Sequence, residues 1–232
     1  MSTPGAIACI GGGGFLTDDL RGVQERHLLT LLPELRRARP RVLYLGLAHG
    51  DAESRQLRAY KVFASLGCDV NPLPFFPYEM KRDYVAEAMD ADLIYVGGGN
   101  TPAMIAVWRE FGFDRVLHDA WQAGTVLAGV SAGANCWFDQ YVTDSVPGGG
   151  VRAGLGWLRG TFCPHLDSEP WRQPLLAGVP DAPAYGVREG GMMVVRVGAD
   201  PDFVADRAGV TANVRLPGRE AQEVPSRDLS SR

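Results

Sequence analysis

The stretch TVLAGVSAGANCWF, residues 125–138, decides the fold. It begins as an apolar run, breaks at Gly-Val-Ser-Ala-Gly, and continues with residues typical of a helix start. Gly-x-Ser-x-Gly between a strand and a helix is the nucleophile-elbow pattern, in which a sharp turn exposes the serine hydroxyl. The glycines have a steric reason, because side chains would collide where the chain folds so tightly. The stretch therefore indicates an α/β fold with Ser131 at a strand end, either as a nucleophile or as a helix cap.

Short apolar runs alternate with helical segments before this stretch. The runs AIACI, RVLYLGLA and ADLIYVGGG are separated by segments with helical periodicity. Such alternation predicts strand–helix–strand units and a mostly parallel central sheet with helices on both faces. Helices are expected over residues 19–37, 51–66 and 101–123. Three glycine-rich segments (11–14, 97–99 and 129–133) then fall at the carboxyl edge of the sheet, where such sheets place their functional groups.

The second half of the chain has a different pattern. Beyond Val151 it becomes more β-like, with TFCPH, AYGVREGGMMVVRV and FVADRAGVTANVRL as extended runs and a short helical piece over 171–176. It contains neither an internal repeat nor a low-complexity linker, so we expect a single domain over residues 1–232. Residues 219–232 have little to bury and are expected to form a loose tail.

Composition excludes several classes of protein. The chain has 232 residues, 46% of them hydrophobic and 22% charged, which is the ordinary globular range. A net charge of −4 without a block of Lys and Arg argues against nucleic acid or a membrane surface as partner. No apolar run approaches the roughly 20 residues that span a bilayer, and the N-terminus lacks the features of a signal peptide. Four cysteines without CxxC spacing argue against a zinc site or disulfide framework and favour the cytoplasm.

A serine nucleophile needs a base, and the chain has four histidines. His27 and His118 lie on amphipathic helices. His49 follows the second strand, so it lies at the carboxyl edge of the sheet and is the reserve candidate. His165 follows a proline at the end of an apolar run, in TFCPHLDSE, and is the only histidine after Ser131. By elimination, His165 is the predicted base.

A carboxylate should orient the imidazole, and the candidates are Asp139, Asp144, Asp167 and Glu189. Glu189 stands immediately before a strongly apolar strand, where an unpaired carboxylate would be costly. Asp144, in VTDSVPGGG, is its competitor at a strand-to-loop junction. The order serine, histidine, acid differs from that of α/β-hydrolases, in which the histidine comes last. An ordinary lipase or esterase scaffold is therefore disfavoured.

Four motifs taken together carry a family resemblance. YVGGGNTPAMI, GVSAGAN, the Pro-His of FCPHLDSE and YGVREGG occur in an order that resembles the dipeptidase E and cyanophycinase family of serine peptidases. The resemblance runs from the first glycine run to the strand after Glu189. It implies a flavodoxin-like three-layer sandwich related to class I glutamine amidotransferases, with serine in place of their cysteine.

The resemblance also implies roles for individual residues. Ser131 would be the nucleophile and His165 the base, with Glu189 as the acid and Asp144 as the alternative acid. The backbone N–H groups of Gly98, Gly99 and Ala132 would form the oxyanion hole, with Asn100 bracing that loop beside the substrate. Arg172 is the match for a cation that binds the side chain of an N-terminal aspartate in the substrate. No metal or cofactor is implied, and CIGGGG lacks the register of a dinucleotide site.

The expected activity is hydrolysis of short peptides from the N-terminal side, by an aspartyl dipeptidase (Asp-X) or a related aminopeptidase. The segment between His165 and Arg172 is shorter than in dipeptidase E, which would open the pocket and broaden its specificity. Trp137 and Trp171 are candidates for shaping that pocket. The alternatives are a cyanophycinase-like β-aspartyl peptide hydrolase, an esterase or acyltransferase on the same elbow, and a non-catalytic relative. A homodimer is compatible with the sequence but no pattern requires it.

Overall fold

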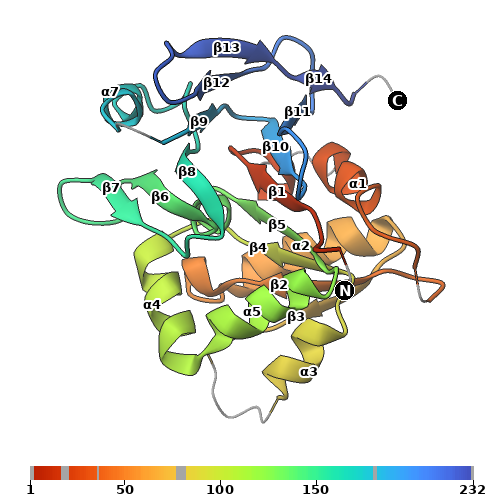
Figure 1. The fold of residues 1–232 in the computed structure, drawn as a ribbon. Coiled ribbons are helices and arrows are strands. Elements are labelled where there is room, and N and C mark those ends of the chain that lie inside the picture. Colours follow the sequence, from red (N-terminus) through yellow and green to blue (C-terminus); the bar gives the residue numbers. More distant parts are fainter. Residues whose placement is uncertain (1–2, 17–20, 36, 77–81, 180–181, 231–232) are drawn as a thin grey trace.

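The computed structural model describes residues 3–16, 21–35, 37–76, 82–179 and 182–230. They form a central sheet of eight strands and a second sheet of six, with helices packed around the central sheet (Figure 1). In the described part of the chain, no helix is long and apolar enough to cross a membrane.

The central sheet is mostly parallel, as predicted. Its strands, in spatial order, are β14 (Arg227–Asp228), β11 (Asp202–Ala205), β10 (Gly191–Val195), β1 (Ile7–Ile10), β5 (Val126–Val130), β4 (Leu93–Val96), β2 (Arg41–Leu45) and β3 (Asp69–Pro72). The five strands from β1 to β3 in this order are mutually parallel, whereas β10 is antiparallel to both of its neighbours, β1 and β11. The carboxyl ends of β1, β5, β4 and β2 therefore meet at one edge.

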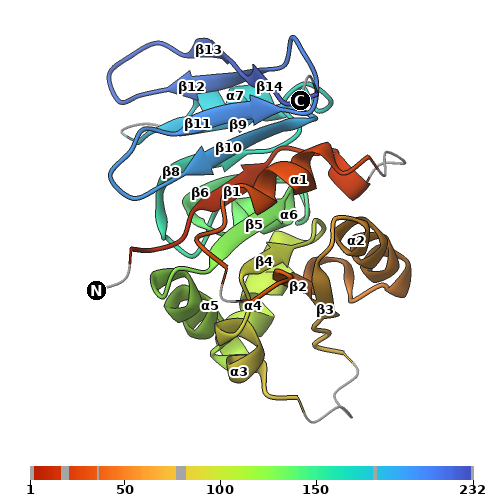
Figure 2. The same cartoon turned by 90° about the vertical axis from the view of Figure 1, so that its right-hand side faces the viewer.

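Side chains that alternate along the central strands bury both faces of this sheet. In β1, Ile7 and Cys9 belong to one hydrophobic cluster, whereas Ala8 and Ile10 belong to another on the opposite face. The helices are α1 (Val23–Leu29), α2 (Glu53–Ser65), α3 (Tyr84–Met89), α4 (Thr101–Phe111), α5 (Phe113–Gln122), α6 (Ala132–Asn135) and α7 (Arg172–Ala177). Helices α1 and α2 cover one side of the sheet, and α3, α4 and α5 lie on the other (Figure 2). The three-layer arrangement is confirmed.

Two of the predicted helices differ from those observed. The expected helix over 101–123 is two helices, because Gly112 adopts a left-handed conformation (φ 67°) that ends α4 and begins α5. The expected helix over 19–37 is reduced to α1, and residues 17–20 and 36 lie outside the described residues. The prediction over 51–66 is confirmed by α2.

The second sheet was foreseen only as a β-rich region. Its strands, in spatial order, are β13 (Gln222–Pro225), β12 (Thr211–Arg215), β9 (Ala184–Val187), β8 (Leu158–Cys163), β6 (Phe138–Thr143) and β7 (Gly150–Ala153). The helix after the elbow is short, since α6 ends at Asn135 and β6 begins at Phe138. The polypeptide thus passes from the first sheet to the second immediately after Ser131.

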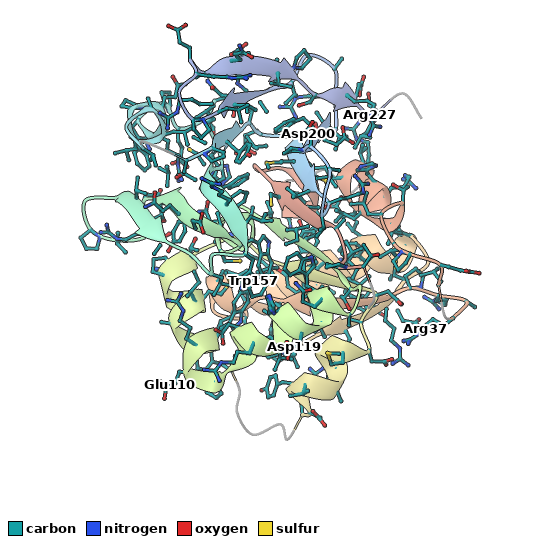
Figure 3. The ribbon with its side chains drawn as sticks, viewed as in Figure 1. Arg37, Glu110, Asp119, Trp157, Asp200 and Arg227 are labelled. Carbon is teal, nitrogen blue, oxygen red and sulfur yellow. The ribbon has the colours of Figure 1, made fainter. Side chains whose placement is uncertain are left out.

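A stack of tryptophans joins the second sheet to the helices below it. Trp157 lies in the loop before β8 (Figure 3). It stacks on Trp137 with ring centroids 5.1 Å apart and on Trp121 at 6.1 Å. Trp137 in turn stacks on Trp108 of α4 at 6.2 Å. Trp108 and Trp137 are fully buried, so Trp137 is part of the core rather than of a substrate pocket.

The prediction of a loose tail over 219–232 is wrong for most of that segment. Residues 222–225 form β13 in an antiparallel pair with β12, and β14 pairs with β11 at the edge of the central sheet. Leu229 is buried in the cluster that contains Ala8 and Ile10. Backbone pairing and one apolar anchor hold this segment, although its composition is polar. Residues 231–232 lie outside the described residues.

Candidate active site

Ser131 lies at the tip of a sharp turn between β5 and α6, as the elbow pattern predicts. Its backbone has φ 54° and ψ −109°, a conformation that a residue with a side chain rarely adopts. The turn is tight enough that a Cβ on Gly129 would lie 2.1 Å from the carbonyl oxygen of Gly133. The Ser131 hydroxyl makes no capping hydrogen bond to α6. The hydroxyl is therefore available for chemistry rather than used as a cap.

His165 and Glu189 are brought together by two loops that follow β8 and β9. The His165 ring contacts the Glu189 carboxylate through Nδ1 and Oε1, and both residues are half-buried. The hydrogen bond that Nδ1–H donates to a carboxylate fixes the tautomer in which Nε2 is the free base. His165 also has a positive φ of 56°, so the backbone is held in an unusual conformation to aim this ring.

The glycine-rich end of β1 is the common support of these three residues. The Ser131 N–H donates to the Ile10 carbonyl at 3.0 Å, and the His165 N–H donates to the next carbonyl, that of Gly11, at 3.2 Å. The Glu189 carboxylate packs against Gly12, where a Cβ would lie 2.1 Å from Oε2. Three consecutive residues of one strand end thus hold the serine, the histidine and the carboxylate.

Two further residues position Glu189, and sequence reasoning gave them no such role. Asp167 Oδ1 accepts a hydrogen bond of 2.9 Å from the Glu189 backbone N–H. The Ser168 hydroxyl donates to Glu189 Oε1 at 3.3 Å. Both lie in HLDSE, directly after His165, and only the fold shows that this segment lies against Glu189. Asp167 was considered as a triad acid, but its carboxylate holds the backbone of Glu189.

The other candidate acids have different partners. Asp144 follows β6 and is paired with Arg172, at 3.3 Å between Oδ1 and Nη2. Asp139 accepts a hydrogen bond of 3.0 Å from the Gly160 N–H between β6 and β8. Of the four carboxylates, Glu189 is the one in contact with the His165 ring.

The loop after β4 carries Gly98, Gly99 and Asn100 at the same sheet edge. It is tied down by hydrogen bonds from the Gly97 N–H to Leu45 O and from the Asn100 N–H to Ala48 O. Gly99 has φ 142°, and a Cβ there would lie 2.1 Å from Ala48 O, so the loop requires glycine. The Ala132 N–H is the first amide of α6, which has no acceptor within its helix.

Asn100 makes its contacts within the protein. Its Oδ1 accepts from the Ala103 N–H at 2.9 Å and so caps α4, while its Nδ2 donates to Ser145 O at 3.2 Å. Ser145 Oγ donates in turn to Gly99 O at 3.3 Å. Asn100 therefore connects the Gly98–Gly99 loop to the segment after β6.

His49 is the reserve candidate for the base, and both of its ring nitrogens are hydrogen-bonded to nearby groups of the protein. Its Nδ1 accepts a hydrogen bond of 3.2 Å from the Ala52 N–H, so Nε2 carries the proton and donates to the Tyr44 hydroxyl at 2.8 Å. Burial of the ring, with a smaller contribution from the charge of Arg55, lowers the pKa of His49 to about 4. His49 is thus neutral and engaged at neutral pH, which leaves His165 as the candidate base.

The lowered pKa of His49 predicts a loss of stability in acid. The unfolded chain protonates His49 near pH 6.5, whereas the folded chain does so near pH 4, so the unfolded state binds more protons between these values. The free energy of unfolding should therefore fall by roughly 1–2 kcal/mol between pH 6.5 and pH 4, a value reduced for the partial exposure of the ring. Urea unfolding of the wild type and His49→Gln at pH 7, 5 and 4 measures this, and the variant should lose less. Parallel losses in the two proteins would contradict the assignment.

Arg172 lies at the start of α7 and is only 3% exposed. Its Nε donates to Glu169 Oε2 at 2.7 Å, and its Nη2 pairs with Asp144. The guanidinium also lies over the ring of Trp171, 4.8 Å from its centroid, and that ring is partly exposed. Arg172 is thus neither on the surface nor free to meet a substrate, because its charge is already paired with two protein carboxylates.

Within the described ranges, no three His, Cys, Asp or Glu side chains are grouped as metal ligands would be. The four cysteines are free and buried.

The sequence profile of peptidase family S51 matches residues 10–199, which include all the residues of this site. The chain belongs to peptidase family S51. It is 40% identical over 168 residues to a protein of Bacillus subtilis (strain 168) named "Uncharacterized peptidase YgaJ", an alignment that covers 72% of this chain and 71% of that protein. A member of this family is a serine-type peptidase, so the chain is a hydrolase of that class.

Two solved structures have the same fold. A peptidase from an acI-B1 Actinobacterium superposes with a TM-score of 0.70 at 21% identity, covering 97% of this chain and 95% of the other. A putative peptidase E from Listeria monocytogenes EGD-e gives a TM-score of 0.63 at 16% identity, covering 87% of this chain and 98% of the other. These similarities confirm the flavodoxin-like α/β fold of an S51 peptidase.

Proposed function

We propose that this S51 peptidase hydrolyses short peptides from the N-terminal side, with Ser131 as nucleophile, His165 as general base and Glu189 as the carboxylate that orients the imidazole. The observation that carries the proposal is the contact of His165 Nδ1 with Glu189. The end of β1 that holds this pair also holds Ser131. The resemblance of the whole fold to a structure named as a putative peptidase E supports the choice of short peptides.

In this mechanism the Ser131 hydroxyl attacks the scissile carbonyl while His165 Nε2 takes its proton. The tetrahedral intermediate places its oxyanion between the Ala132 N–H and the N–H groups of Gly98 and Gly99, and each such donor typically contributes about 3–4 kcal/mol. The imidazolium then gives its proton to the leaving amine, and an acyl-enzyme remains. Water, activated by the same imidazole, attacks the acyl carbon and regenerates Ser131.

We further propose that the first residue of the substrate is not restricted to aspartate. An acidic side chain would need a cation with free donors, but Arg172 is buried and paired with Glu169 and Asp144. These two carboxylates outnumber the single guanidinium, so the group as a whole is not positively charged. The paired state of Arg172 therefore favours a less selective dipeptidase or aminopeptidase over an Asp-X dipeptidase.

Steady-state hydrolysis of a small panel tests the proposal. The panel contains Asp-Leu, Leu-Leu, a tripeptide of each series, a β-aspartyl-arginine peptide and a p-nitrophenyl ester, with Ser131→Ala as control. We expect turnover of Asp-Leu and Leu-Leu with kcat/KM values within about tenfold of each other, since the factor expected for one uncharged contact is of that order. Cleavage of the ester alone would favour an esterase, and cleavage of the β-aspartyl peptide alone would favour a cyanophycinase-like enzyme. Activity that survives in Ser131→Ala would overturn the mechanism.

A further inference from the structure

The burial of the Arg172 guanidinium requires an explanation, because a buried charge is costly unless it is fully paired. All three of its nitrogens are engaged by protein acceptors. Nε donates to Glu169 Oε2 at 2.7 Å, Nη1 donates to the Val142 carbonyl at 3.1 Å, and Nη2 pairs with Asp144 Oδ1 at 3.3 Å. These acceptors come from two separate segments of the chain, so Arg172 joins them.

The first segment is the turn that carries His165. The Glu169 N–H donates to the His165 carbonyl at 2.9 Å, and the Arg172 N–H donates to the Glu169 carbonyl at 3.0 Å. The Gln173 side chain adds a bond of 3.4 Å to the Leu166 carbonyl. The turn from His165 to α7 is thus closed by hydrogen bonds, and the ion pair of Glu169 with Arg172 holds its far end.

The second segment is the end of β6, which supports the Gly98–Gly99 loop. Thr143 Oγ1 accepts from the Ser145 N–H at 3.1 Å and shapes the turn after the strand. Ser145 then exchanges hydrogen bonds with Gly99 and Asn100, as described above. Through Val142 and Asp144, Arg172 is therefore connected to the loop that presents the oxyanion donors.

We propose that Arg172 is a positioning residue that fixes the His165 turn relative to the Gly98–Gly99 loop. This inference rests on the proposed function, because it assigns these two parts their roles as base and oxyanion hole. The imidazole and the oxyanion donors must act on the same carbonyl, and a misplacement of about 1 Å between such groups can lower a rate by about 100-fold. Arg172 acts on the reaction through Glu169, Val142 and Asp144, without touching the substrate.

The test compares Arg172→Ala and Arg172→Lys with Arg159→Ala, which removes an exposed arginine on β8. For Asp-Leu and Leu-Leu, Arg172→Ala should lower kcat by about 10- to 100-fold for both substrates, with KM changed by less than about threefold. Added guanidinium ion should restore part of the activity of Arg172→Ala. Arg172→Lys should recover less activity than Arg172→Ala does with added guanidinium ion, because one ammonium cannot reach three acceptors in the geometry of a guanidinium. Arg159→Ala should match the wild type.

The opposite pattern would overturn the proposal. If Arg172 binds the substrate, the loss will be confined to Asp-Leu and will appear in KM, and Leu-Leu will be cleaved normally. If Arg172→Ala does not fold, as judged by its thermal melt, Glu169→Gln replaces it. That change removes the ion pair of Glu169 with Arg172 but keeps the arginine. It should lower kcat for both dipeptides, and unchanged kinetics in a folded Glu169→Gln would contradict the proposal.

A second measurement separates this inference from the proposed function. The rate at which a fluorophosphonate labels Ser131 depends on the histidine and the oxyanion donors but not on the choice of peptide. If no dipeptide is cleaved by the wild type, the proposed function fails, yet slower labelling of Arg172→Ala would still support the positioning role. Labelling of this variant at the wild-type rate would overturn it.

Discussion

Replacing Ser131 by alanine is expected to lower kcat by about 10⁴-fold or more while the protein remains folded, because loss of a triad nucleophile has effects of this size. The hydroxyl makes no capping bond to α6, so its removal takes nothing from the stability of that helix. Peptide turnover measured beside thermal unfolding checks both parts. A variant that lost activity only by unfolding would leave the nucleophile unassigned to Ser131.

The backbone of Ser131 gives this prediction a matched control. Alanine retains the unfavourable conformation at φ 54°, whereas glycine tolerates it. Ser131→Gly should be as inactive as Ser131→Ala but more stable, by about 1 kcal/mol after the greater flexibility of glycine in the unfolded chain is subtracted. Equal stability of the two variants would show that the turn stores no strain.

Glu189→Gln should produce the second large effect, a fall in kcat of about 10³- to 10⁴-fold, comparable with the loss of the orienting acid in other triads. The amide occupies the same space, but it presents an N–H or a neutral oxygen to His165 and no longer stabilises the imidazolium. Asp144→Asn is the matched change at the competing carboxylate. It removes the ion pair of Asp144 with Arg172 and should lower kcat by about tenfold or less.

The ratio of the kcat values of these two variants decides between the candidate acids. A larger fall for Asp144→Asn than for Glu189→Gln would reverse the assignment.

The sequence predicted those features that depend on neighbouring residues. The buried strand β1, the turn at Ser131 and the mostly parallel sheet all follow from patterns within a few positions. The break at Gly112 was missed because both halves of residues 101–123 have helical periodicity, and a glycine inside such a pattern is often tolerated.

The features that were not predicted depend on distant partners. The second sheet requires β6 to pair with β8 and β9 with β12, and no local pattern specifies such pairings. Glu189 was ranked ahead of Asp144 as the acid without knowledge of which carboxylate contacts His165, because that contact is a property of the fold and not of either segment. The burial of Arg172 was also hidden, since its Nη1 acceptor, the carbonyl of Val142, lies 30 positions earlier in the chain.

The support of the site by one strand end has a consequence for folding. Strand β1 precedes the other segments of the site in the chain, and its Ile7 pairs with Leu127 of β5 and with Val195 of β10. Contacts so far apart in sequence form late, because closing long loops is entropically costly. The end of β1 can therefore align the serine and the histidine only after these distant strands have paired with it. Peptidase activity is therefore expected only late in folding, once β1, β5 and β10 have paired.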